Sequence, residues 1–273
     1  MHTALCDNDP LAWGIAVWHW LASRKSDLPS YALLEDEPSR GLPSDLAAQE
    51  NSAAHRELSD RIESDLRAHA ADENSPGFAT FLKEGNGLLQ FRAPQLAGGC
   101  LLAFSSPFRA ADYARVQVPG KKFAFFCSSP AQVVTGIAQM RAEAGITHLA
   151  LDRCPRCNVF TTVGVSSFDT ADEVIAIWTI AKATEIARCN LYLDYALAAA
   201  AAGQLLVARN VALELVGHVT AEDPRAHLLL VKLALQLRDK RLQRDARRFL
   251  TFLKQDAALA QLDAAIKTRR VQY

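Results

Sequence analysis

Residues 123–168 constrain the fold of this 273-residue chain more than any other stretch. The apolar run FAFFC is followed by SSP, in which a serine can cap a helix and proline suits its first turn. Apolar residues then recur at helical spacing as far as Gly145, and a second apolar run, ITHLAL, follows. This order predicts a helix between two strands joined by a right-handed crossover, with the strands paired in parallel.

The flanking segments extend this unit into a small sheet. Residues 88–92 and 100–104 read as strands, and the second is again followed by serine, serine, proline and a short helix. Residues 159–165 are rich in β-branched side chains, which favour a further strand. We therefore expect an α+β (α/β) fold, a small mixed sheet with crossover helices.

Helical segments are expected before and after this sheet domain in the sequence. The predicted division is an N-terminal helical segment (1–77), an α/β sheet domain (78–168) and a helical-hairpin domain (169–273). In the last, AAAGQLLVARNVALEL is similar to the second half of a tetratricopeptide hairpin, with glycine at the turn and small residues where helices meet. The spacing of the following helices departs from a regular repeat, so we expect a tetratricopeptide-like array of hairpins.

The composition is that of a globular chain. Half of the residues are hydrophobic, yet no apolar run is long enough to span a bilayer, and residues 1–10 do not resemble a signal peptide. Six cysteines without such a signal are most simply free thiols. We therefore expect a cytoplasmic protein that does not bind membranes, and the alanine and arginine usage is bacterial in style.

Charge is distributed in two opposed blocks although the net charge is zero. Residues 27–73 hold twelve acidic and four basic residues, and residues 225–273 hold the reverse. On a helix, Arg241, Arg244 and Arg248 share one face, which could bind a partner. No aromatic residues or nucleic-acid reader motif accompany them, so a protein partner is favoured over a nucleic acid.

The motif Cys154-Pro155-Arg156-Cys157 has three interpretations. A redox dithiol requires a helix after the first cysteine, but a β-branched run follows here. Half of a zinc site requires further ligands, and Cys127 is a candidate third if its strand ends beside the strand that precedes Cys154. The simplest interpretation is two unmodified thiols in a turn, so no cofactor is the leading expectation and zinc the alternative.

Asp152 and Arg153 follow a strand that is predicted to be parallel, where α/β proteins often bind ligands. No nucleophile, base and acid combination with a known signature accompanies them, and no phosphate-binding loop is found. We name no catalytic or cofactor-binding residue, and the expectation leans toward a protein that is not an enzyme.

Residues 99–152 resemble the N-terminal domain of the SseB (enhanced serine sensitivity) family. The resemblance is carried by CLLAFSSP from Cys100, by FAFF from Phe123, and by GITHLALD from Gly145. It covers about a fifth of the chain, and the CPRC turn and helical C-terminal part depart from the family pattern. It implies a protein-interaction module and no enzyme chemistry.

Together these features predict a non-catalytic interaction or adaptor protein that binds a protein partner. The alternative is a zinc-binding or thiol-based regulatory protein that uses the CPRC turn.

Overall fold

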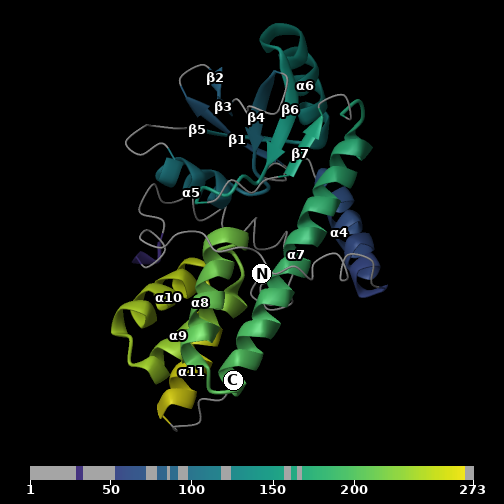
Figure 1. The fold of residues 1–273 in the computed structure, drawn as a ribbon. Helices are drawn as coiled ribbons and strands as arrows, with labels where there is room; N and C mark the ends of the chain where they lie inside the picture. The colour runs from purple at the N-terminus through teal and green to yellow at the C-terminus, as the bar shows by residue number, and fades with distance from the viewer. Residues whose placement is uncertain are drawn as a thin grey trace. The chain divides into compact units, whose positions relative to one another are not determined.

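The structure is a computed structural model, and Figure 1 shows its fold. It describes the following residues: 29–32, 53–71, 79–84, 87–91, 98–117, 124–156, 161–164 and 168–267. Much of the N-terminal helical segment expected at residues 1–77 lies outside these ranges, including its tryptophan-rich stretch at 10–24 and most of the acidic block before residue 53.

The chain combines a small sheet with many helices, which confirms the mixed class expected from the sequence. The strands are β1 (Ala79–Glu84), β2 (Gly87–Leu88), β3 (Gln90–Phe91), β4 (Gly99–Ala103), β5 (Ala124–Ser128), β6 (Ile146–Leu151) and β7 (Thr161–Gly164). They form two ladders, in the order β2-β1-β5 and β3-β4-β6-β7. Among the described strands, only β4 and β6 pair in parallel, and the other pairs are antiparallel.

The predicted pairing of the strand at residues 123–127 with the strand at 146–151 is wrong. Strand β5 pairs with β1, and β6 pairs with β4 and β7. An antiparallel bridge between Thr80 and Phe104 joins β1 to β4, so two strands lie between β5 and β6. Both still run in the same direction, because β5 is antiparallel to β1 and β1 is antiparallel to β4.

Strand β1, which was not predicted from the sequence, pairs with β5 in the place expected for β6. Its six residues include only two large apolar side chains, Phe81 and Leu82, and end in Lys83 and Glu84. The strand expected at 88–92 is split at Leu89, whose N–H donates to Leu82 O at 2.8 Å and whose C=O accepts from Leu102 N–H at 3.3 Å. The Leu89 backbone therefore connects β1 to β4.

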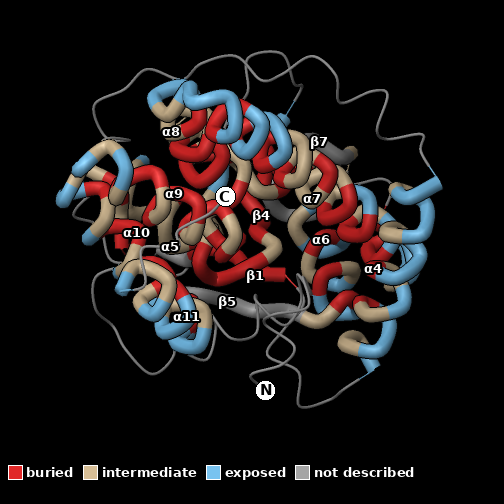
Figure 2. The backbone as a smooth tube through the Cα atoms, turned by 90° about the horizontal axis from the view of Figure 1, so that it is seen from below, coloured by how far each residue is buried: buried red, intermediate tan, exposed pale blue. Residues whose placement is uncertain are grey.

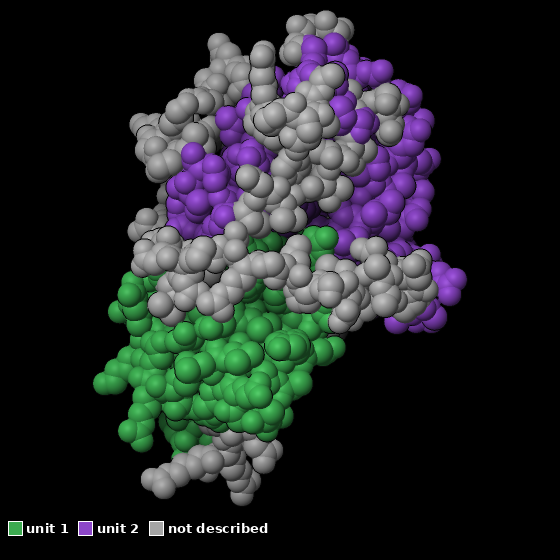
Figure 3. All heavy atoms as spheres, in the orientation of Figure 1, with its two compact units in different colours: residues 1–16, 24–50, 185–273 green, residues 17–23, 51–184 purple. Residues whose placement is uncertain are grey.

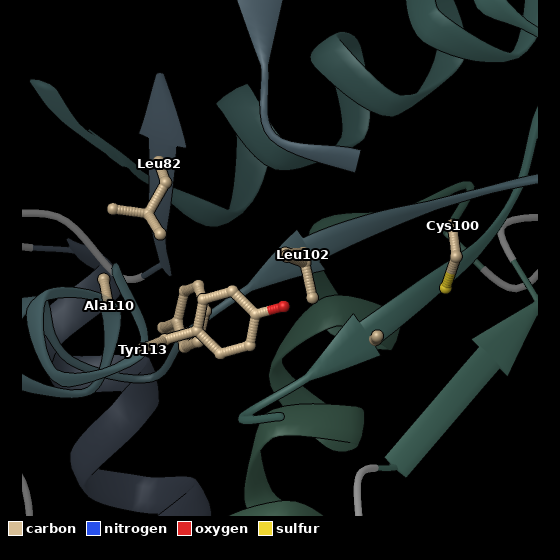
Figure 4. Packing of buried hydrophobic residues seen from close by; sticks show 7 residues of the cluster. Leu82, Cys100, Leu102, Ala110 and Tyr113 are labelled. Atoms are coloured by element: carbon tan, nitrogen blue, oxygen red, sulfur yellow. The ribbon is translucent and has the colours of Figure 1, made fainter. Parts of the chain in front are cut away.

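Helix α5 (Pro107–Gln117) covers one face of the sheet. Its Ala110 and Tyr113 pack in one buried cluster with residues of β1, β4 and β6 (Figure 4). The members from the strands and the β4 end are Leu82, Cys100, Leu102, Phe104 and Ala150. Leu101 and Leu149 alternate with these, point to the other face and are also buried. The sheet is thus covered on both faces, as expected around a parallel strand pair.

The crossover helix α6 (Pro130–Ala144) has the ends that the sequence predicted. The Ser129 hydroxyl accepts from Gln132 N–H, and the Gln132 side chain accepts from Ser129 N–H, a reciprocal capping box. Gly145 ends the helix with φ 62°, a left-handed conformation that glycine adopts without a steric penalty. The helix contacts β5 and β6.

The C-terminal part is helical, as expected. Its helices are α7 (Ala171–Ala201), α8 (Leu205–Glu214), α9 (Pro224–Leu237), α10 (Lys240–Phe252) and α11 (Asp256–Lys267), with a π-helical turn at Leu215–Val219. Helix α7 is the longest of these, with 31 residues, and no glycine or proline interrupts it. Each of α8, α9 and α10 contacts the next helix in sequence. In Figure 2, exposed residues follow the outer sides of α8 and α10, whereas α9 is mostly buried.

The chain divides into two compact units, coloured in Figure 3. We call residues 17–23 and 51–184 the sheet unit, and residues 1–16, 24–50 and 185–273 the helical unit. Helix α4 (Ala53–Ala71) belongs to the sheet unit, where Arg67 forms an ion pair with Asp172 of α7. The three-segment division expected from the sequence includes residues outside the described ranges and stays a prediction.

Candidate functional site

The CPRC turn follows β6 at the carboxyl end of the parallel strand pair. Asp152 ends the strand with φ 51°, an uncommon conformation for a residue other than glycine. Cys154 is buried, and its Sγ lies 3.4 Å from the Arg156 N–H that donates to it. Cys157 lies outside the described residues.

Helix α5 holds this turn through charged side chains. Arg156 donates to both carboxylate oxygens of Asp112, at 2.7 and 3.0 Å, and Arg115 donates to Oδ1 at 2.8 Å. Gln117 also donates to the carbonyl of Pro155. Burial alone would raise the pKa of Asp112, but the hydrogen bonds and charges of Arg156 and Arg115 outweigh it and lower that pKa. Asp112 is therefore an ionised anchor for the turn.

A second carboxylate occupies the place where α/β proteins often bind a ligand. Asp152 Oδ1 accepts from the Ser105 N–H at 2.8 Å, just before α5, and Oδ2 lies 3.7 Å from Arg109 Nη1. Backbone N–H groups before a helix and a nearby arginine are features that bind anions. Here the chain's own carboxylate fills that position, which supports a structural role for Asp152.

Arg153 lies against Tyr113 of α5. Its guanidinium carbon is 5.9 Å from the ring centroid, and its Nη1 donates to the Tyr113 hydroxyl at 3.3 Å. Burial raises the pKa of Tyr113, and the Arg153 charge opposes that rise. The side chains of Asp152, Arg153 and Arg156 are thus each engaged by α5 or by the segment before it.

The structure removes the argument for Cys127 as a third metal ligand. Cys127 pairs with Thr80 of β1, and Thr80 bridges to Phe104, beside the end of β6. The ends of β5 and β6 are therefore three strand spacings apart, ~14 Å along the sheet, instead of adjacent. Within the part of the chain that the structure describes, no group of three histidine, cysteine or acidic side chains is placed to hold a metal.

The other described cysteines lie elsewhere. Cys100 is in β4, where burial raises its pKa to about 11. Cys189 is buried in α7, and its thiol donates to Asp223 Oδ2 at 2.7 Å. Burial is the largest cause that raises its pKa, and the Asp223 charge adds to it. Both are therefore protonated thiols with little nucleophilic character at neutral pH.

The arginine face predicted on the basic helix is present on α10. Arg241, Arg244 and Arg248 are exposed, while residues such as Leu242, Phe249 and Leu250 are buried on the other side. Arg244 lies 3.4 Å from its neighbour Asp245, whose side chain is 8% exposed, so this acid contributes little surface. Arg247 faces Asp263 of α11 and is not part of this face.

A buried aromatic cluster in the helical unit was not anticipated. Tyr31 stacks on Phe249 of α10 at 4.8 Å between ring centroids, and His227 of α9 stacks on the same ring at 4.5 Å. The Tyr31 hydroxyl lies 2.5 Å from His227 Nδ1. In the sequence, Tyr31 stands in a segment with several prolines, and no spacing or motif links it to His227 or Phe249.

Comparisons with protein-family models, with curated proteins and with solved structures found no match to this chain. Among the described helices, none combines the length and apolar character needed to cross a membrane. The resemblance to the SseB family therefore stays a prediction.

Proposed function

We propose that this chain is a non-catalytic interaction protein that binds an acidic surface of a protein partner through α10. The observation that carries this proposal is the exposed row of Arg241, Arg244 and Arg248. On a helix these positions are separated by three and four residues, so their Cα atoms span about 10 Å along one side.

The position of the positive charges at the start of α10 does not stabilise the helix, which favours a role in binding. Lys240 and Arg241 lie in the first turn of α10, where the helix dipole disfavours positive charge by ~0.3–1 kcal/mol per residue. The Asp239 cap, whose carboxylate accepts from Leu242 N–H at 2.9 Å, offsets part of this cost. Exposed positive charges at the start of a helix, where they do not stabilise it, are consistent with a site for an acidic partner.

A protein partner is favoured over a nucleic acid because the row lacks aromatic side chains for base stacking. Among its exposed neighbours on α10 are Lys240 and Thr251, and none is aromatic. Carboxylates three or four residues apart on a partner helix would match the arginine spacing. The resemblance of residues 99–152 to the SseB family and of the α7–α8 segment to a tetratricopeptide hairpin also favours a protein-interaction function.

The test compares the intact chain with two triple variants, one with glutamate and one with lysine at positions 241, 244 and 248. Proteins that these three chains capture from cell extract are identified after nuclease treatment. The protein that the intact chain captures most strongly is purified, and its binding is titrated at several salt concentrations. We expect binding that weakens with salt, is lost in the glutamate variant and persists in the lysine variant. Binding that is equal in all three proteins, or that nuclease removes, would overturn the proposal.

A further inference from the structure

Among the residues that the structure describes, five large apolar side chains are exposed; Ile180 lies early in α7, and the other four lie near the turn between α7 and α8. Tyr195 is 58% exposed and Leu197 40%, both on α7, and Leu206 is 57% and Val207 40%, both on α8. All four belong to the helical unit. We call these four residues the hairpin patch.

The hairpin patch lies in an uncharged segment. From Tyr195 to Ala208 no residue carries a charge, although 22% of the chain is charged. The turn between the helices, including Ala201, Ala202 and Gly203, is also exposed. A helical hairpin in water normally has polar residues on its outer side, so an uncharged, exposed one indicates an interface.

Opposite charges border the hairpin patch. Asp194 precedes it on α7 and shares a helix face with Leu197, whereas Arg209 follows it on α8 and shares a face with Leu206. Asp194 is exposed, and within the described part of the chain neither residue forms an ion pair. Arg209 donates only to the side-chain oxygen of Asn210, at 3.2 and 3.0 Å.

We propose that the hairpin patch binds a second copy of this chain in a two-fold dimer. In a two-fold interface whose axis runs parallel to the helices of the hairpin, α7 of one copy faces α8 of the other. That arrangement places the two uncharged surfaces together and brings Asp194 of each copy toward the partner's Arg209. The border is therefore complementary to itself, which an unrelated partner or a lipid surface would not require.

The exposed area sets the strength of this dimer. A stable interface buries ~800 Å² on each partner, more than four partly exposed side chains and an alanine-rich turn supply. Self-association is accordingly expected in the micromolar range, so the dimer forms and dissociates with protein concentration.

Sedimentation of the full chain across the micromolar range tests this dimer. We expect the unmodified protein to dimerise, and Leu206→Glu to be monomeric. Asp194→Arg places like charges opposite Arg209, and Arg209→Asp places like charges opposite Asp194, so each variant should associate at least about tenfold more weakly. An equal mixture of the two should recover a heterodimer, because every border pair then has opposite charges.

The mixture separates a direct effect on self-association from an effect on folding. A variant that is misfolded would not regain association when it is mixed with the other variant. Gln236→Arg, at an exposed site on α9, is the matched control and should dimerise normally. A monomeric unmodified protein, a dimer that survives Leu206→Glu, or a mixture that stays monomeric would overturn the proposal. So would binding of the unmodified chain to phosphatidylcholine vesicles that Leu206→Glu abolishes, because lipid would then be the occupant.

Discussion

At the scale of single residues, His227 shows how a buried polar side chain is fixed by its neighbours. Its Nε2 lies 2.7 Å from the carbonyl of Ala221, which can only accept, so Nε2 carries the proton. In the neutral ring Nδ1 is then the acceptor, and the Tyr31 hydroxyl donates to it. Tyr31, 196 residues away in sequence, is thereby held on the helical unit.

Replacement of Tyr31 by phenylalanine should destabilise the protein by about 1–3 kcal/mol, because the buried Nδ1 of His227 loses its donor while the ring stacking is kept. Urea unfolding of the full chain measures this. Tyr195→Phe, at an exposed site, is the control and should change the free energy of unfolding by less than about 0.5 kcal/mol. Equal effects of the two substitutions would contradict the assigned hydrogen bond.

The same histidine predicts a loss of stability in acid. Burial lowers the pKa of His227 to about 4, although the Ala221 carbonyl and the Asp223 charge oppose this. Between an unfolded value near 6.5 and the folded value, the unfolded chain binds a proton that the folded chain does not. Stability should therefore fall by about 3 kcal/mol as the pH drops from 6.5 to 4.

An NMR titration of the imidazole measures this pKa directly, and His227→Asn should flatten the dependence of stability on pH over that range. A midpoint near 6.5, or an unchanged slope in the variant, would show that the ring is not held in its neutral form.

The cysteines of the CPRC turn give a prediction about metal content. Two thiols from the turn supply half of the ligands of a structural zinc site, and the described residues place no further set beside Cys154. Purified protein should therefore hold much less than one zinc per chain, and Cys154→Ser with Cys157→Ser should not change it. Stoichiometric zinc that this variant loses would instead support the regulatory alternative.

At the scale of elements, local chemistry predicted helices better than strands. The ends of α6 followed from Ser129, Pro130 and Gly145, because caps act within a few residues of the chain. The pairing of β5 was not predictable in this way, because it depends on which distant strand, β1 or β6, lies beside β5. Strand β1, with few apolar residues, gave no signal strong enough to reveal that competitor.

Two glycines of one helix should respond to alanine in opposite directions. At Gly145, with φ 62°, alanine should cost about 1 kcal/mol, because a side chain disfavours the left-handed conformation although space is open. At Gly136, inside α6 and also without close neighbours, alanine should stabilise by up to about 1 kcal/mol. Chemical denaturation of both variants checks this, and a shift of the same sign in both would contradict the assigned end of α6.

At the scale of the whole molecule, the sequence predicted the surfaces of helices more reliably than the neighbours of distant residues. The exposure of Arg241, Arg244 and Arg248 followed from helical spacing alone. The ion pairs that join α5 to the CPRC turn and the docking of Tyr31 on α9 and α10 did not. Such contacts depend on tertiary packing, which spacing along one element cannot specify.

Cross-linking of the intact chain in cell extract tests the proposed interaction most directly, because Lys240 begins α10, Lys254 follows its end, and both are exposed. Amine-reactive cross-links from both lysines should lead to acidic segments of the same partner protein. They should disappear when Arg241, Arg244 and Arg248 are glutamate and remain when these are lysine. Cross-links from these lysines that are indifferent to the charge of the row would contradict a partner site on α10.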